Sequence, residues 1–241
     1  MTFRTQEGFT VPSVTAEQMR EVDRIAVEEF GLGILQMMEN AGRSLAENVL
    51  EMLGGADGEV AILAGSGGNG GGGLCCARHL LNRGLEVRII LSKESEALSG
   101  AARTQLGILQ AGGLGLVDPS RAGDALRRAQ VVVDALIGYS LRGAPKGRVA
   151  ELIDLCNRYA AGVLSLDVPS GLHATTGEAP GAVVQPDRTL TLALPKTGLR
   201  DVPGELYLAD IGISPRVFQR LGLHFRSPFG RRYWVRLEGA V

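Results

Sequence analysis

Three loops in this sequence combine residue types that can bind an anion, hold a metal ion or move a proton. The first is a glycine-rich run, GSGGNGGGG, over residues 65–73. The second follows three valines and begins at Asp134, in VVVDALIGYSLRGAPKG. The third, DVPSG over residues 167–171, places Asp167 and Ser170 on a turn that proline and glycine restrict. Together the loops supply two carboxylates, a hydroxyl, an amide side chain and a run of backbone amides.

The glycine-rich run is suited to a phosphate group. Consecutive glycines let the backbone approach an anion closely, and amides at the start of a following helix point toward it. The run satisfies GxGxxG at Gly65, Gly67 and Gly70, but dinucleotide-binding dehydrogenases also want an acidic residue after the next strand, where this sequence has Ser92 and Lys93. An ordinary NAD-dependent dehydrogenase is therefore not favoured, and a flexible turn without a ligand is the alternative.

The other loops have structural alternatives as well. Asp134 could cap the turn that follows it, and DVPSG could be a capped turn without a chemical role. The sequence has no His/Cys cluster at zinc spacing, no GxSxG and no GxxxxGK[ST]. His79, Cys75 and Cys76 lie in a helical apolar pattern that favours core packing, although a thiolate would be stabilised at a helix N-terminus.

The elements that must position these loops alternate between short apolar strands and amphipathic helices. We expect strands over 59–64, 85–92, 113–117, 130–136, 161–168, 189–194 and 205–212, and helices beginning near 16, 34, 74, 97, 120 and 147. Nearly continuous apolar strands of this kind indicate βαβ units and a parallel sheet covered on both faces. In such an α/β fold ligands bind at the carboxyl ends of the strands, where all three loops lie.

Composition excludes several classes of protein. The chain has 241 residues, and 25 basic against 26 acidic side chains leave a net charge of −1. This balance supplies no field for recruiting nucleic acid or a membrane surface, and no apolar stretch is long enough to span a membrane. With three cysteines and no apolar signal near the N-terminus, we expect a cytoplasmic protein without a disulfide framework.

The two ends of the chain differ from its middle. Residues 1–14 show no periodic pattern and are expected to form a flexible arm, whereas residues 15–212 hold the predicted elements. Residues 213–241 form a basic extension with six arginines, one glutamate and the aromatic pair Tyr233 and Trp234. We favour a packed C-terminal element with solvated arginines over a contact surface for a polyanion.

Several pieces of the sequence, in this order, resemble the NAD(P)H-hydrate epimerase family, the YjeF N-terminal domain. The similar pieces are TAEQMREVDR (15–24), QMMENAGR (36–43), the glycine-rich run with ARHL (77–80), DALIG (134–138), SLDVPSGL (165–172) and DRTLTLALPKTGL (187–199). The resemblance implies a Rossmann-like three-layer α/β/α fold with a mostly parallel central sheet, a homodimer, and interconversion of the R and S hydrates of NADH and NADPH. The hydrated nicotinamide nucleotide is then a substrate, and a separate dehydratase acts on the product.

The resemblance also implies a set of site residues. A potassium ion would be bound by Asn69, Asp134 and Ser170. Asp167 would be the catalytic acid or base, because epimerisation needs a proton moved at the hydrated ring. The substrate would contact Gly68, Asn69, Gly70, Gly71, Gly72, Gly138, Tyr139, Ser140, Leu141, Arg142, Gly143, Ala144 and Asp167.

The glycine-rich run departs from the family pattern GxGNNGGDG at two positions. Gly68 stands in place of the first Asn and Gly72 in place of the Asp, whereas Asn69 is retained. With Gly72 expected just before a helix, the departure should affect stability little and activity more. The alternative function is therefore a non-catalytic, nucleotide- or RNA-linked dimeric binding module of the same fold. No fused dehydratase is expected after residue 212.

Overall fold

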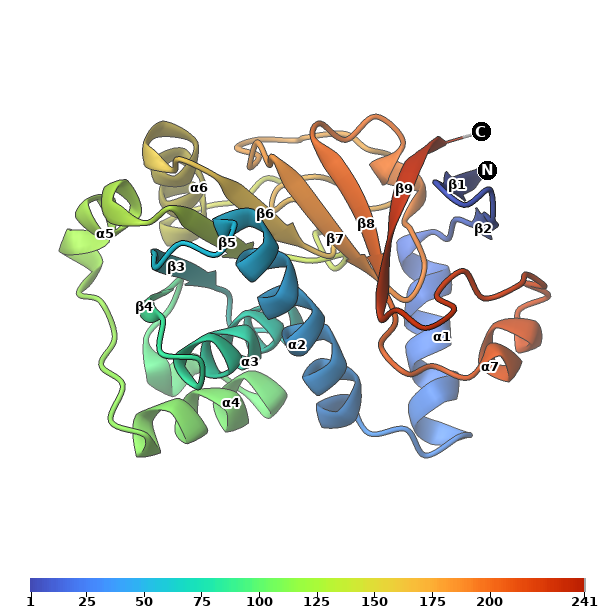
Figure 1. Cartoon of the computed structure of the whole chain (residues 1–241), viewed down its shortest axis with the longest axis horizontal. Helices are drawn as coiled ribbons and strands as arrows, with labels where there is room; N and C mark the ends of the chain where they lie inside the picture. Colours follow the sequence, from blue (N-terminus) through green and yellow to red (C-terminus); the bar gives the residue numbers. More distant parts are fainter. Residues whose placement is uncertain (241) are drawn as a thin grey trace.

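A nine-stranded sheet runs through the computed structural model, which describes residues 1–240 (Figure 1). The elements are β1 (Thr2–Thr5), β2 (Thr10–Pro12), α1 (Ala16–Glu28), α2 (Ile34–Leu53), β3 (Glu59–Ala64), α3 (Gly68–Leu81), β4 (Glu86–Leu91), α4 (Gly100–Ala111), α5 (Ala122–Arg128), β5 (Val131–Ala135), α6 (Arg148–Tyr159), β6 (Val163–Leu166), β7 (Arg188–Leu192), β8 (Glu205–Ala209), α7 (Pro215–Arg220) and β9 (Trp234–Ala240). The strand order is β2-β1-β9-β8-β7-β6-β5-β3-β4. The strands from β4 to β8 are parallel, and β9, β1 and β2 add antiparallel pairs. The predicted α/β class with a mostly parallel sheet is confirmed.

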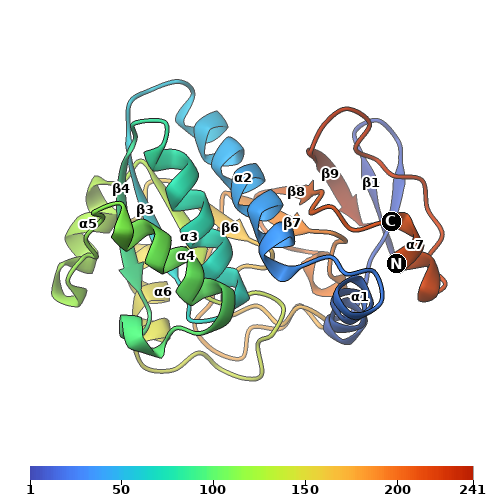
Figure 2. The ribbon, with the colours of Figure 1, turned by 90° about the horizontal axis from the view of Figure 1, so that it is seen from below.

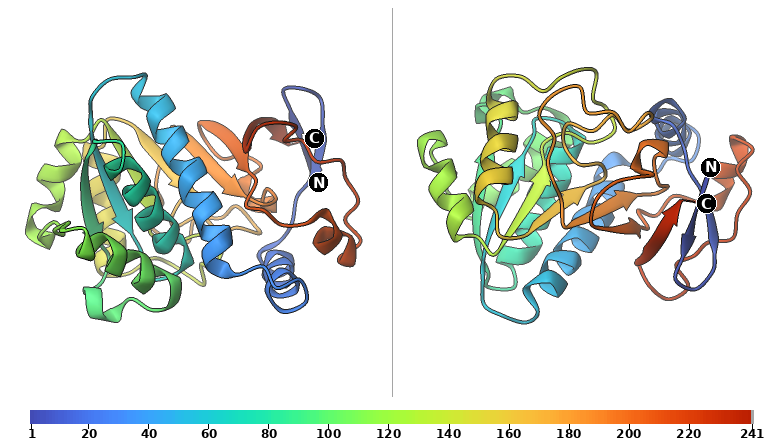
Figure 3. Two further views of the ribbon diagram at one scale, coloured as in Figure 1. Left: turned by 60° about the horizontal axis from the view of Figure 1, so that its bottom comes forward. Right: turned by 90° about the horizontal axis from the view of Figure 1, so that it is seen from above.

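Helices cover both faces of the parallel strands. Val60 and Ile62 of β3 pack into a core with α2, α3 and α4, whereas Ala61 and Leu63 pack with α5 and α6 on the other face. Figure 2 shows α2, α3 and α4 side by side, and α6 lies on the opposite face (yellow in Figure 3, right). Because both faces are covered, every residue of β5 is buried, which explains the continuous apolar runs in the sequence.

Helix α1 begins as the sequence predicts. The hydroxyl of Thr15 accepts a hydrogen bond from the amide of Gln18 at 3.2 Å, and the side chain of Gln18 accepts one from the amide of Thr15 at 2.9 Å. This reciprocal pair is a capping box. Met19, Val22 and Ile25 form the buried face of the helix. The polar residues on either side of this face therefore lie at the edge of the core.

The flexible arm predicted for residues 1–14 is wrong. Residues 2–5 and 10–12 form a hairpin whose Phe3 and Val11 are fully buried, and β1 pairs with β9 from the other end of the chain. The two termini therefore lie close together (Figure 1). Strands this short carry little local signal, and their partner is remote in sequence, so no periodicity revealed them.

The described part of the basic extension over residues 213–241 contributes a strand to the same sheet. Strand β9 pairs with β8, and two arginines of the extension form exposed ion pairs with other parts of the chain: Arg236 with Glu205 at 3.0 Å and Arg232 with Glu7 at 2.7 Å. The favoured interpretation, a packed C-terminal element, is confirmed.

Two predicted boundaries also need correction. The strand expected over 113–117 is reduced to one bridge between Leu116 and Ile89, because the chain only touches the edge strand β4 there. Helix α3 begins at Gly68, not near residue 74, so most of the glycine-rich run is helical. Among the described residues, no helix is both long and apolar enough to cross a membrane.

Candidate functional site

A pocket of about 580 Å³ opens at the carboxyl ends of the central strands. Its lining comes from α1, α2, the first turns of α3, the loop after β5 and the ends of β6 and β7. In the sheet, β3 lies between β4 and β5, so the two strands that follow β3 along the chain lie on its opposite sides and the strand order reverses there. Ligands of open α/β sheets bind at such a switch point.

The glycine-rich run forms the end of the pocket at the start of α3. Gly67 is the N-cap, and the first intrahelical bond runs from the amide of Gly71 to the carbonyl of Gly67 at 3.0 Å. The amides of Gly68, Asn69 and Gly70 therefore precede the hydrogen-bonded helix and can bind an anion. Gly72 lies inside the helix, which corrects its predicted place as a cap residue.

Close packing explains several of these glycines. A Cβ atom on Gly70 would lie 1.8 Å from the carbonyl oxygen of Gly65, and one on Gly73 would lie 2.6 Å from the Cβ of Ala135. On the facing helix, a Cβ on Gly42 would lie 2.5 Å from the side chain of Cys75. A Cβ on Gly68, in contrast, would meet nothing within 4 Å in the described part of the chain. Gly70 and Gly73 are thus required by packing, and Gly68 is not.

Replacing Gly70 by alanine should destabilise the protein toward the upper end of the about 1–3 kcal/mol that overpacking costs, because a backbone oxygen blocks the new methyl group. The matched change Gly68→Ala should instead stabilise by about 0.5–1 kcal/mol, because alanine is the better helix former. Urea unfolding of the two variants checks this. Equal unfolding midpoints would show that the loop can move away from the methyl group.

Asp134 and Ser170 form one buried hydrogen-bonded unit behind the pocket. Asp134 accepts bonds from the Ser170 hydroxyl at 2.5 Å, the Ser170 amide at 2.8 Å and the Ser165 hydroxyl at 2.8 Å. Both residues are fully buried. Burial raises the pKa of the Asp134 carboxyl group, and the hydrogen bonds from Ser170 and Ser165 oppose that rise. The unit fixes the DVPSG turn against the end of β5.

Asp167 is held in an unusual conformation at the end of β6. Its φ of 67° lies in the left-handed region, which aspartate tolerates better than most residues and which recurs at functional sites. One carboxylate oxygen forms a buried ion pair with Lys196 and accepts a bond from the Leu192 amide at 3.2 Å. The other faces the backbone of Gly138, where a Cβ would lie 3.3 Å from it and 3.0 Å from the Asn69 side-chain oxygen. Asp167, Gly138 and Asn69 therefore converge.

Two charged residues at this site were not predicted: Asp23 lines the pocket, and Lys196 lies behind the lining against Asp167. Lys196 is only 1% exposed, and its ammonium group donates to the Leu192 carbonyl at 2.8 Å as well as to Asp167. Asp23 on α1 accepts a hydrogen bond from the hydroxyl of Tyr139 at 2.5 Å. Lys196 had a usable signal, because it follows a buried strand as Asp167 does. Asp23 had no signal from its spacing, since it resembles any polar residue on an amphipathic helix, although it lies in the family-like segment 15–24.

The residues predicted to bind potassium offer a suitable donor set. Asp134 and Ser170 are in contact, and the Ile137 carbonyl lies 3.2 Å from the Ser170 hydroxyl. One carboxylate among neutral oxygens fits a hard ion of low charge. The buried amide nitrogen of Asn69 has no hydrogen-bond partner among the described residues, and turning this amide would place its oxygen there. The residues fit the ion, and the ion itself stays a prediction.

The predicted substrate contacts divide into two groups. The pocket is lined by Gly68, Asn69, Gly72, Gly138, Tyr139, Ser140 and Asp167. Gly70 and Gly71 are buried behind this surface, and the loop residues Leu141, Arg142, Gly143 and Ala144 lie outside the lining. These four loop residues could touch only a ligand that extends beyond the pocket.

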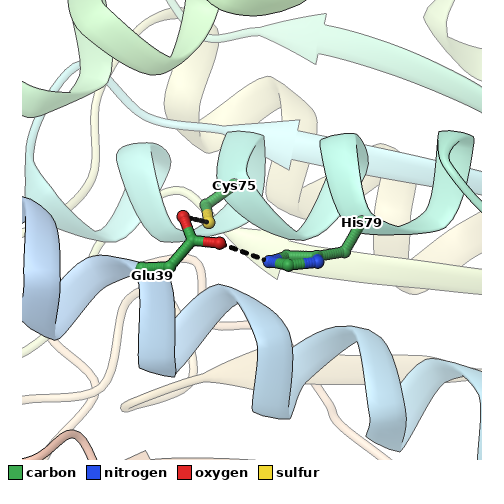
Figure 4. A group of neighbouring side chains, drawn as sticks. All are labelled: Glu39, Cys75 and His79. Atoms are coloured by element: carbon green, nitrogen blue, oxygen red, sulfur yellow. Dashed lines mark hydrogen bonds and ion pairs between the residues drawn. The ribbon is translucent and has the colours of Figure 1, made fainter.

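A separate cluster between α2 and α3 could be mistaken for a metal site. Glu39, Cys75 and His79 place their ligand atoms within 4.8 Å of one another (Figure 4). However, the guanidinium of Arg78 forms an ion pair with Glu39 and lies 3.5 Å from the Cys75 sulfur, so a cation is already supplied by the chain. Burial and the Glu39 charge raise the pKa of the Cys75 thiol to about 12. The cluster joins two helices, which agrees with the packing role predicted for Cys75 and His79.

The pocket lies where the strand order reverses, beside the N-terminus of α3, and helices cover both faces of the parallel sheet. These features define a Rossmann-like α/β protein. The chain belongs to the family described as YjeF-related protein N-terminus, whose model matches residues 34–198. A Dehalogenimonas lykanthroporepellens protein named NAD(P)H-hydrate epimerase is 51% identical over 99% of this chain and 98% of its own. A Rhodopirellula baltica protein of the same name is 36% identical over 88% of this chain and 89% of its own.

The chain is also similar to a longer protein and to a more distantly related crystal structure. The Moorella thermoacetica protein named bifunctional NAD(P)H-hydrate repair enzyme is 41% identical over 93% of this chain but only 44% of its own length. A yeast crystal structure matches with a TM-score of 0.84 at 22% identity, covering 94% of this chain and 100% of that one. At this identity the yeast structure supports the fold alone. The predicted family and fold are confirmed.

Proposed function

We propose that this protein interconverts the R and S hydrates of NADH and NADPH. The observation that carries the proposal is the convergence of Asp167, ion-paired with Lys196, and the N-terminus of α3 in one pocket. The helix N-terminus suits the phosphates of a dinucleotide, and the carboxylate suits proton transfer at the hydrated ring. The names of the relatives that match nearly the whole chain support the same reaction.

The chemistry of the hydrate explains why a carboxylate is needed. Water adds to an enamine with its hydroxyl on the carbon next to nitrogen, so the stereocentre carries both a hydroxyl and the ring nitrogen. The configuration changes when that hydroxyl leaves and water returns to the other face. Asp167 takes the proton from the entering water, and Lys196 and the Leu192 amide hold the carboxylate in place.

Three further features belong to the proposal. Potassium bound by Asn69, Asp134 and Ser170 would supply a positive charge beside the pocket when present. The protein acts as a homodimer, and a dehydratase on another polypeptide consumes the S hydrate. The Moorella thermoacetica relative, named as a bifunctional repair enzyme for these hydrates and matched over 44% of its length, supports this coupling.

The proposal is tested by incubating the purified R hydrate of NADPH with the protein and following the S hydrate by chromatography. We expect equilibration at a rate proportional to protein concentration and faster than in buffer. A rate equal to that in buffer, at every protein concentration, would contradict the proposal.

The two departures from the family loop predict a slow enzyme. Gly68→Asn with Gly72→Asp should raise turnover by more than tenfold, about 1.4 kcal/mol of barrier, because it restores two groups aimed at the pocket. The structure has room for the change at Gly68, whereas at Gly72 a Cβ would lie 2.7 Å from the Cδ2 of the buried Leu166, which must shift. Gly68→Asn alone should change stability by less than about 1 kcal/mol, whereas Gly72→Asp should add an overpacking cost of about 1–3 kcal/mol, because the buried Leu166 must move. Turnover measured on the double variant and both single variants checks this, and unchanged turnover would show that the glycines are tolerated.

A further inference from the structure

Epimerisation of the hydrate, on which this inference rests, involves two proton transfers. The leaving hydroxyl must take up a proton before it departs as water, and the entering water must give one up. The two events occur on opposite faces of the ring, so a single fixed carboxylate cannot serve both well. The pocket should therefore contain a second acid–base group.

Asp23 is placed to be that group. It lies on α1 and lines the same pocket as Asp167, which comes from the end of β6. The Tyr139 hydroxyl donates a hydrogen bond to it at 2.5 Å, which fixes one oxygen and leaves the other available. The Lys196 ammonium that pairs with Asp167 lies 5.9 Å from the Tyr139 ring centre, so the partners of the two carboxyl groups are neighbours.

The surroundings of the two carboxyl groups differ. Asp167 has a directly bound cation, Lys196, whereas Asp23 has the neutral Tyr139 hydroxyl. Burial raises the pKa of Asp23, the Asp167 charge raises it further, and the Tyr139 hydrogen bond and the Lys196 charge oppose the rise. The other charged groups lining the pocket are Arg20, Arg24 and Glu28 of α1 itself. Two carboxyl groups in such different environments can share one proton and act as an acid and a base.

We propose that Asp23 is a second catalytic residue, which exchanges a proton with the substrate oxygen on the face of the ring opposite Asp167. In one direction the Asp23 carboxyl gives its proton to the hydroxyl as the carbon–oxygen bond breaks, and the ring nitrogen lone pair forms a carbon–nitrogen double bond. Water then adds to the other face, the electron pair returns to nitrogen, and Asp167 accepts the proton. The substrate keeps its composition, and one proton has moved from Asp23 to Asp167. The reverse reaction exchanges the two roles.

This assignment predicts how the rate depends on pH. The pair works when it carries one proton, so the rate should fall at low pH, when both carboxyl groups are protonated, and at high pH, when both are ionised. Asp23→Asn should lower kcat by about 10²–10⁴-fold and remove one side of this profile. The matched control is Glu17→Gln, an exposed carboxylate on the same helix, which should keep both rate and profile.

Tyr139→Phe provides an independent test that does not depend on how Asp23→Asn folds. The Tyr139 hydrogen bond lowers the pKa of Asp23, so its removal should raise that pKa and move the alkaline side of the profile to higher pH. A residue with only a structural role would not produce this shift. Unchanged profiles in both Asp23→Asn and Tyr139→Phe, in a protein that interconverts the hydrates, would overturn the role of Asp23 alone. A wild-type protein without interconversion would overturn the proposed function as well.

Discussion

Asp167→Asn is expected to lower turnover of the hydrates by about 10²–10⁴-fold, because it removes the positioned proton acceptor. Binding of the dinucleotide should change much less, since the amides at the start of α3 are untouched. Rates and substrate affinity measured separately check this. Loss of affinity with unchanged turnover would place Asp167 in binding rather than in proton transfer.

The same change also removes the partner of a buried cation, which calls for a second variant. Lys196 is 1% exposed, so an unpaired ammonium there should destabilise the fold by about 3–5 kcal/mol. The double change Asp167→Asn with Lys196→Met should recover most of that stability, because an apolar side chain of similar size replaces the charge. Turnover should remain low. Asp124→Asn, which breaks an exposed pair with Arg127, should cost at most about 1 kcal/mol.

Asp134→Ala is expected to be the most destabilising of the proposed single substitutions that leave the Asp167–Lys196 ion pair intact. It leaves the Ser170 amide and the Ser165 hydroxyl without their hydrogen-bond acceptor. Each buried donor without a partner lowers the free energy of unfolding by about 1–3 kcal/mol. Urea unfolding should show a loss of several kcal/mol.

The milder change Asp134→Asn tests the ion that these residues are proposed to bind. Potassium should raise the melting temperature of the wild type relative to a large cation such as tetramethylammonium, because a ligand of the folded state stabilises it by mass action. The Asn variant should lose this difference. The same potassium effect in both proteins would contradict the role of Asp134 as an ion ligand.

Local patterns in the sequence were enough to predict most of the fold. Three valines followed by Asp134 indicated a buried strand that ends at a site, and Thr15 marked the start of α1. These signals are local because burial on both faces and helix capping depend on neighbouring residues. The helical start at Gly68 was missed because glycine is a poor helix former, and here tertiary packing of α3 overrides that preference.

The parts that could not be predicted depend on contacts between distant segments. Strand β1 pairs with β9 from the opposite end of the chain, and β1 has only four residues, too few to be recognised alone. Within the site, Tyr139 and Asp23 are 116 positions apart, and the helical pattern around Asp23 does not distinguish it from a solvated side chain. Only the folded chain shows that α1 closes the pocket.

The most direct test of the central claim supplies the R hydrate of NADPH together with a dehydratase that accepts only the S hydrate. With the wild-type protein added, NADPH should be recovered completely and faster than with the dehydratase alone. The Asp167→Asn, Lys196→Met variant, folded but without its proton acceptor, should give the slow rate of the dehydratase alone. Recovery that is no faster with the wild-type protein than without it would contradict the account.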